Sequence, residues 1–99
     1  MGYRVEKTAV FEKWLRKLTT RKDRYRILAR LDMVSNGHFG DHKQIGERLF
    51  ELRMFFGPGY RIYFTIFGNT VVYLLAGGDK SSQQKDIEKA RNLLKELEE

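Results

Sequence analysis

The sequence predicts an α+β fold in the order β-α-α-β-β-β-α, with a mostly antiparallel sheet and packed helices. Apolar residues recur at helical spacing near both ends of the chain, whereas residues 49–67 alternate with the period of two that is typical of strands. The length of 99 residues matches one ordinary domain, so we expect residues 1–99 to form a single domain.

The N-terminal part begins with a weakly alternating segment, residues 3–7, which predicts a short strand. Thr8 can then cap a first helix, and Thr20 can cap a second one that ends at Gly37. The apolar stripes of the two helices are Phe11, Trp14, Leu15 and Leu18, and then Ile27, Leu28, Leu31 and Val34. Because so few residues separate the helices, we expect them to pack as an antiparallel hairpin with their Arg and Lys side chains outward.

The middle of the chain predicts a loop followed by two strands. Residues 36–46 contain three glycines and little periodicity, which favours a loop. Residues 49–56 and 60–67 alternate strictly, and Gly57-Pro58-Gly59 turns the chain between them.

The C-terminal part predicts one more strand and a helix. Gly68-Asn69 indicates a two-residue hairpin of type II′, with glycine first. Residues 70–76 are continuously apolar, which is typical of a central strand covered on both faces. Gly77-Gly78 should leave the sheet, and Ser81 with Gln84 should form a capping box for the last helix. The apolar stripe of that helix is Ile87, Ala90, Leu93, Leu94 and Leu97.

Strand parity places the candidate chemistry on one face of the sheet. The fully apolar face, which includes Ile62, Phe64 and Ile66, must be buried, so Arg53 and Arg61 lie on the opposite face with Glu51 and Tyr63. Two guanidiniums from adjacent strands could converge there on a phosphate, which their planar shape fits. In the alternative arrangement, Arg53 pairs with Glu51 on a solvated face.

Lys80 is a third candidate cation, in the turn between the last strand and the last helix. The preceding Gly77-Gly78 would let a ligand approach the backbone closely, and a helix N-terminus favours an anion. The ordinary alternative is a strand exit followed by a capped helix. The segment lacks the full pattern of a nucleotide-binding P-loop.

The positive charge is concentrated near the N-terminus. The formal net charge is +6, and residues 1–36 hold ten Lys or Arg against four Asp or Glu. Such clustering is typical of proteins that bind polyanions, although a solvated helix face is an equally acceptable interpretation. The candidate RNA-binding residues are Arg16, Lys17, Arg24, Arg26 and Lys43.

The composition of the chain excludes several kinds of site and chemistry. The absence of cysteine rules out disulfides, thiol catalysis and cysteine-based zinc sites. His38 and His42 flank Asp41, but no further ligand is evident, so we expect no metal and no cofactor. His38 should be solvated, whereas His42 is a candidate general acid or base. The charged N-terminus and the short apolar runs, far below the ~20 residues of a membrane helix, predict a cytoplasmic protein with no membrane contact.

Five runs of residues resemble the addiction-module killer-protein branch of the RelE/ParE toxin superfamily, whose members are HigB-like and RelE-like. They cover nearly the whole chain in the expected order. The Gly-Pro-Gly-Tyr-Arg segment of the fourth run and the Gly-Gly-Asp-Lys-Ser-Ser sequence of the last run are specific when found together. The runs are Phe39-Gly40-Asp41, Gly46-Glu47, Glu51-Leu52-Arg53, Phe56–Phe64 and Gly77–Ser82.

The resemblance implies a RelE fold and the toxin of a type II toxin–antitoxin system, held in a hetero-oligomer with a helix-turn-helix antitoxin. It implies an endoribonuclease that cleaves mRNA on the ribosome without a metal. Arg61 matches the arginine that follows Gly-Tyr at the start of the third strand, Arg53 matches an arginine of the second strand, and Lys80 falls near a basic residue after the last strand.

Two departures from RelE leave the general base and acid unassigned. RelE has two lysines on the second strand, where this chain has Leu49 and Glu51, and no tyrosine follows Tyr73 here to match the one early in the last RelE helix. The candidates for these roles are Glu51, His42, Lys43 and Lys85.

Two other functions remain open at this stage. A ParE-like toxin of the same fold would inhibit DNA gyrase by binding, without a catalytic set. A non-catalytic RNA-binding module of the double-stranded type is disfavoured because that domain has the order α-β-β-β-α.

Overall fold

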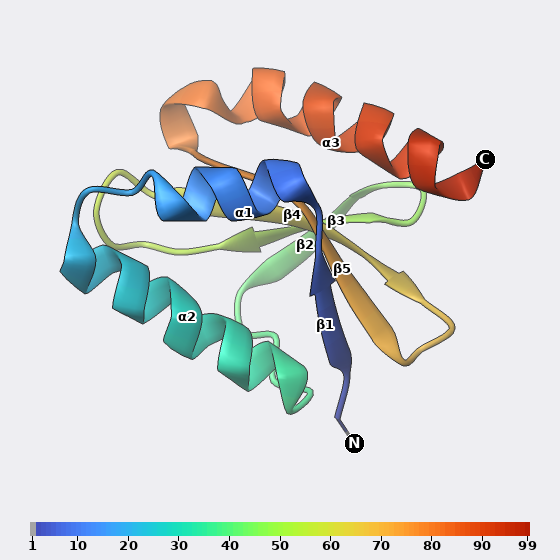
Figure 1. Ribbon diagram of the computed structural model, residues 1–99, viewed down its shortest axis with the longest axis horizontal. Helices are drawn as coiled ribbons and strands as arrows, with labels where there is room; N and C mark the ends of the chain where they lie inside the picture. The colour runs from blue at the N-terminus through green and yellow to red at the C-terminus, as the bar shows by residue number, and fades with distance from the viewer. Residues whose placement is uncertain (1) are drawn as a thin grey trace.

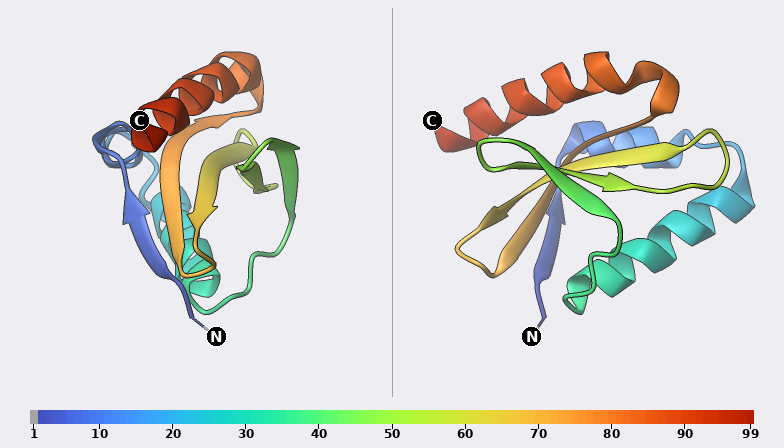
Figure 2. Two further views of the ribbon diagram at one scale, coloured as in Figure 1. Left: turned by 90° about the vertical axis from the view of Figure 1, so that its right-hand side faces the viewer. Right: turned by 180° about the vertical axis from the view of Figure 1, so that it is seen from behind.

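The computed structural model describes residues 2–99, in which helices cover both faces of one five-stranded sheet (Figure 1). Helices α1 and α2 pack on one face and α3 packs on the other, as the side views show (Figure 2). None of these helices is both long and apolar enough to cross a membrane. The elements are β1 (Arg4–Lys7), α1 (Ala9–Arg16), α2 (Arg21–Ser35), β2 (His42–Gly46), β3 (Leu49–Arg53), β4 (Tyr60–Phe67), β5 (Val71–Asp79), a 3₁₀ turn η1 (Lys80–Ser82) and α3 (Gln83–Glu98).

The strand order is β1-β5-β4-β3-β2. Strand β1 is parallel to β5, and the three other pairs are antiparallel. The predicted α+β class with a mostly antiparallel sheet is therefore confirmed, and the apolar segment 70–76 does lie in a central strand.

Strand β2 corrects the loop that we predicted for residues 36–46. Its sequence, His-Lys-Gln-Ile-Gly, shows no alternation because the strand lies at the sheet edge with three of its five residues exposed. Pairing with β3 creates this strand, with His42 opposite Leu52 and Lys43 opposite Glu51. The order is thus β-α-α-β-β-β-β-α.

Helices α1 and α2 begin directly after Thr8 and Thr20, the two residues predicted to cap them. The Thr8 hydroxyl accepts a hydrogen bond from the backbone N–H of Phe11 at 3.0 Å and donates one to the Leu75 carbonyl at 2.7 Å. Helix α2 begins after Thr20 as predicted, although the Thr20 side chain makes no capping bond. Figure 1 shows α2 running back from the end of α1 at an oblique angle. The chain reverses direction as predicted, but both helices pack against the sheet.

The turn between β4 and β5 differs in type from our prediction. Gly68 and Asn69 both have positive φ, 56° and 59°, and the Thr70 N–H bonds the Phe67 carbonyl at 3.1 Å. Two positive φ values define a type I′ turn, whereas the predicted type II′ needs only the first. Asparagine tolerates the left-handed region well, so this pair fits either primed turn.

Gly77 and Gly78 do not leave the sheet, because β5 continues through them to Asp79. A Cβ at Gly77 would overlap the Trp14 ring, and one at Gly78 would overlap the Asp86 carboxylate. The space beside these glycines is therefore filled by the side chains of Trp14 and Asp86, whereas we had expected a ligand to lie there.

The start of the last helix is also capped differently from our prediction. The Asp79 side chain accepts from the Ser81 N–H at 2.8 Å and forms a capping box with Ser82 around η1. The predicted Ser81–Gln84 box is therefore wrong, because the extra 3₁₀ turn moves the cap two residues earlier.

The two faces of the sheet enclose two separate apolar cores, one of which is on the face that strand parity assigned to the interior. Ile62 and Phe64 are buried beneath α1 and α2, and Ile66 packs partly buried beside them. Tyr63 is buried on the other face, against α3. Some stripe residues stay at the surface: Leu28 is 43% exposed and Leu97 is 38% exposed.

Candidate functional site

A small cavity lies where β4 begins and β5 ends. Its volume is about 310 Å³. A Cβ built at Gly59 would lie 3.7 Å from Nη1 of Arg61 and 3.4 Å from Cβ of Lys80, so the two cationic residues meet around this glycine. The cavity is lined by Phe55, Gly57, Pro58, Gly59, Arg61 and Lys80.

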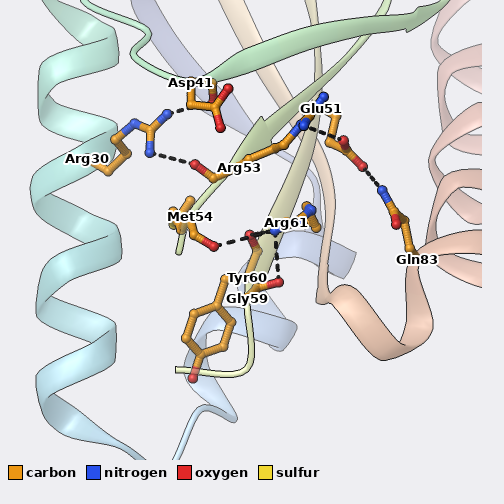
Figure 3. A network of polar contacts seen from close by, with 9 residues as sticks. All are labelled: Arg30, Asp41, Glu51, Arg53, Met54, Gly59, Tyr60, Arg61 and Gln83. Atoms are coloured by element: carbon orange, nitrogen blue, oxygen red, sulfur yellow. Dashed lines mark hydrogen bonds and ion pairs between the residues drawn. The ribbon is translucent and has the colours of Figure 1, made fainter. Parts of the chain in front are cut away.

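Arg61 is a buried cation whose contacts are mainly with the backbone. Its side chain is only 7% exposed. Nη1 donates to the carbonyls of Gly59 and Tyr60, both at 3.1 Å, and to that of Met54 at 3.4 Å (Figure 3). Nε is buried without a hydrogen-bond partner, and none of the ion pairs within residues 2–99 includes Arg61. Its positive charge is therefore oriented but not neutralised by a carboxylate.

Arg53 is paired with Glu51, as in the alternative that the sequence left open. Glu51 is 2% exposed, and its Oε1 lies 3.3 Å from Nε of Arg53 (Figure 3). Its other oxygen accepts a hydrogen bond from Gln83 of α3. Glu51 therefore lies buried beneath α3, whereas the Arg53 side chain remains 31% exposed at the edge of this covered face.

Tyr63 is a buried phenol beside this ion pair. Its Cα lies opposite that of Glu51 in the β3–β4 register, and its ring is fully buried. Burial raises the pKa of Tyr63 far above its ordinary value of 10.0, and the charges of Glu51 and Asp86 add to that increase. The hydroxyl therefore stays protonated at physiological pH and can act only as a hydrogen-bond donor or acceptor.

The remaining candidates for acid–base chemistry lie outside the cavity. His42 pairs with Leu52, on the face that α1 and α2 cover, and its ring contacts Phe39 with 5.3 Å between centroids. Lys43 is exposed on the edge strand opposite Glu51, and Lys85 is exposed on α3. Within residues 2–99 no three His, Asp or Glu side chains are grouped as a metal site would require.

The basic residues of α1 and α2 make different kinds of contact. Nη2 of Arg24 donates to the Leu18 carbonyl at 2.5 Å, which ties α2 to the end of α1. The Arg26 guanidinium lies 4.2 Å from the centroid of the Phe56 ring. Arg16 and Lys17 are exposed at the end of α1, and Lys17 lines a groove of about 450 Å³ between α1 and α3.

Arg30 is a structural arginine that the sequence interpretation missed. It donates to the carbonyls of Phe39, Asp41 and Arg53, with the shortest contact to each at 2.8 Å. Figure 3 shows the contacts to Asp41 and Arg53. Burial lowers the pKa of Arg30, while Asp41 raises it in part. One signal pointed to this role: Arg30 follows Ile27 by three residues, so it falls within the apolar stripe of α2.

The fold defines the class of protein: a small α+β domain of the RelE type. The chain superimposes on a double-arginine mutant of the E. coli toxin RelE in the free state with a TM-score of 0.68, at 16% identity over 90% of this chain and 98% of that one. A chain of the intact E. coli RelBE toxin–antitoxin complex gives a TM-score of 0.63 at 19% identity, covering 78% and 95%. A chain of the RelBE toxin–antitoxin complex from Mycobacterium tuberculosis gives 0.53 at 25% identity, covering 81% and 100%.

The family follows from the sequence match. Residues 13–95 match the family described as phage derived protein Gp49-like, and the chain belongs to this family. It is also 41% identical over 97 residues to an uncharacterized protein of Haemophilus influenzae, covering 98% of each chain. The RelE-like resemblance of the motifs is therefore confirmed.

Proposed function

We propose that this chain is the toxin of a type II toxin–antitoxin system and inhibits translation by cleaving mRNA on the ribosome. One observation carries the chemical part of the proposal: Arg61 and Lys80 line the same cavity, and the Arg61 charge has no carboxylate partner within the described residues. Likeness to RelE and to RelBE complexes, described as a toxin and as toxin–antitoxin complexes, supports the biological part.

Cleavage of RNA needs few groups. The ribose 2′-oxygen attacks the adjacent phosphorus and gives its proton to a general base, and the bond to the 5′-oxygen breaks as that oxygen gains a proton from a general acid. The products are a 2′,3′-cyclic phosphate and a free 5′-hydroxyl. In the proposed complex, Arg61 binds the equatorial oxygens of the pentacoordinate phosphorus, where negative charge accumulates.

Lys80 is the second group of the mechanism, because its exposed side chain lines the same cavity. An ammonium has three N–H donors, so it can stabilise the phosphate and supply a proton to the leaving oxygen. These two cations supply the charge stabilisation that a metal would otherwise give, in agreement with the metal-independent cleavage that the resemblance implies. The base is not among the side chains that line the cavity.

The partner in this proposal is a helix-turn-helix antitoxin encoded beside the toxin, which binds it in a hetero-oligomer. Helix α3 leaves Leu97 38% exposed, and the net charge of +6 favours an acidic partner. Expression of this chain alone should arrest growth in the cytoplasm where ribosomes are active, and co-expression of the neighbouring reading frame should restore growth. Harmless overexpression would argue against a toxin.

The test of the cleavage itself is primer extension on translated mRNA after induction of the protein. We expect discrete cuts within the reading frame that disappear when initiation on that mRNA is blocked. The control is Arg61→Ala at the same expression level, which should leave the mRNA intact. Growth arrest without cuts, together with inhibition of DNA gyrase supercoiling by the purified protein, would replace the proposal with the ParE-like function.

A further inference from the structure

Phe55 is exposed to an extent that packing does not explain. Phe55 is 76% exposed, which is more than any other exposed large hydrophobic residue within residues 2–99. The next residue, Phe56, packs against Tyr60 with 5.6 Å between centroids and lies under the Arg26 guanidinium. The turn between β3 and β4 therefore partly buries one phenyl ring and presents the other to solvent.

The exposed ring lies beside the two cations of the candidate site. Phe55 lines the same cavity as Arg61 and Lys80, and the other lining residues are Gly57, Pro58 and Gly59. A hydrogen bond of 3.1 Å from the Gly59 N–H to the Phe56 carbonyl closes the turn. The turn thus places an aromatic face at the edge of a positively charged cavity.

We propose that Phe55 stacks on a base of the RNA substrate and so positions the adjacent phosphate against Arg61. This inference rests on the proposed function, which it extends from the phosphate to the base. Single-stranded nucleic acids are bound by cations that contact the backbone and by aromatic rings that stack on unpaired bases. The arrangement of Phe55, Arg61 and Lys80 supplies both kinds of contact.

The surroundings of Phe55 favour RNA over a protein partner. A phenyl ring that anchors a protein interface is typically surrounded by further apolar side chains. Here the cavity offers one proline, two glycines and two cations around the ring. The ring should bind a nucleotide in a single-stranded segment, because a base inside a duplex has no free face.

The inference predicts a loss of substrate binding when the ring is removed. In single-turnover cleavage on programmed ribosomes, Phe55→Ala and Phe55→Leu should raise the half-saturating concentration roughly 5- to 150-fold, the range of one base–aromatic stack. The rate at saturation should change less, and Phe55→Trp should restore binding. The matched control is Tyr25→Ala, which removes a 63% exposed ring on α2 that does not line the cavity, and it should change neither quantity.

A second measurement detects stacking without cleavage. An RNA with a 2′-deoxy group at the cleavage position and 5-iodouridine beside it should crosslink to Phe55 on irradiation, as identified by mass spectrometry of the wild-type protein. Crosslinks only elsewhere, or an unchanged half-saturating concentration in Phe55→Ala, would overturn the inference. If Phe55→Ala instead weakens binding of the antitoxin with normal cleavage, the ring is a protein anchor and the inference is wrong.

These outcomes separate the inference from the proposed function. Cleavage that depends on Arg61 but not on Phe55 would leave the ribonuclease proposal intact and remove the stacking role. If the wild-type protein cleaves no RNA, the proposed function fails, and the crosslink decides alone whether Phe55 binds a base. Because Phe55 is exposed, its variants should unfold at the wild-type temperature. This measurement is the control that the substitutions leave folding unaffected.

Discussion

Arg53 and Arg61 lie directly opposite each other in the register of β3 and β4, yet their guanidiniums are bound in different places. Arg53 pairs with Glu51 at 3.3 Å, whereas Arg61 donates to the Gly59 and Tyr60 carbonyls at 3.1 Å. Like charges opposite each other on one face of a sheet repel, and this divergence relieves the repulsion. It also leaves one arginine neutralised and the other available to an anion.

The first prediction follows from that difference. Arg61→Ala should lower the single-turnover rate of mRNA cleavage on saturating ribosomes by roughly 10²–10³-fold, because it removes an electrostatic stabiliser of the transition state. Binding to the ribosome should largely survive. Arg53→Ala should affect cleavage less and stability more, because it leaves the buried Glu51 carboxylate unpaired.

Thermal unfolding of each variant is the control, since Arg61 is itself buried. Arg61→Lys keeps the charge without the planar fork, so it should recover only part of the activity. A folded Arg61→Ala protein that cleaves at the wild-type rate would show that the active site lies elsewhere.

The second prediction concerns the core beneath α1 and α2. Phe64 is 1% exposed and stacks between Phe39 and Phe50, with centroids 5.6 Å and 5.4 Å away. Phe64→Ala should lower the free energy of unfolding by ~3–5 kcal/mol, measured by chemical denaturation. Phe55→Ala removes the same ring from the surface and should cost far less. Equal losses in the two variants would contradict the assignment of faces.

The third prediction separates binding charges from structural ones. The sequence placed Arg24 and Arg26 among the candidate RNA-binding residues, so reversing their charge should weaken RNA binding. The bond from Arg24 to the Leu18 carbonyl now indicates a loss of stability as well, of about 1–3 kcal/mol for Arg24→Ala. The exposed pair Arg16 and Lys17 is the cleaner test.

The double variant Arg16→Glu with Lys17→Glu should bind ribosomes more weakly and with less dependence on salt, while cleavage at saturation is retained. Binding measured over a series of salt concentrations gives both quantities. An unchanged slope of affinity against salt would mean that the end of α1 does not contact RNA, and the charge there would then serve solubility.

The fourth prediction concerns alkaline pH. Tyr60 donates a hydrogen bond to Asp23 at 2.9 Å, and burial together with this bond raises the pKa of Tyr60 from 10.0 to about 12. Because the folded state holds this proton more tightly, its stabilising effect is complete below pH 10 and is lost as the pH rises through about 12.

Tyr60→Phe should therefore reduce the stability at neutral pH and also flatten the fall in stability between pH 10 and 12, as measured by urea unfolding at each pH. Asp23→Asn keeps an acceptor and removes a negative charge, so it should lessen the slope in the same direction. A slope in Tyr60→Phe as steep as in the wild type would assign the alkaline transition to another group.

Local patterns in the sequence determined most of the secondary structure. The helical spacing around Phe11 and Ile27, the alternation of β3 and β4 and the apolar run of β5 each depend on near neighbours. Strand parity alone placed Arg53 and Phe55 on the same side as Arg61. The exposure of Phe55 was not predictable, because parity says nothing of what covers a face.

What only the tertiary structure decided depends on residues that are far apart in the chain. Strand β2 exists because β3 offers it an edge, and Gly77 and Gly78 stay in the sheet because Trp14 and Asp86 occupy the space beside them. The sequence left open whether both arginines are free or whether Arg53 is paired. Helix α3 decides this, because its Gln83 holds Glu51 within reach of Arg53. A sequence pattern shows which side chains share a face, but the partner that neutralises a charge is set by the elements packed against that face.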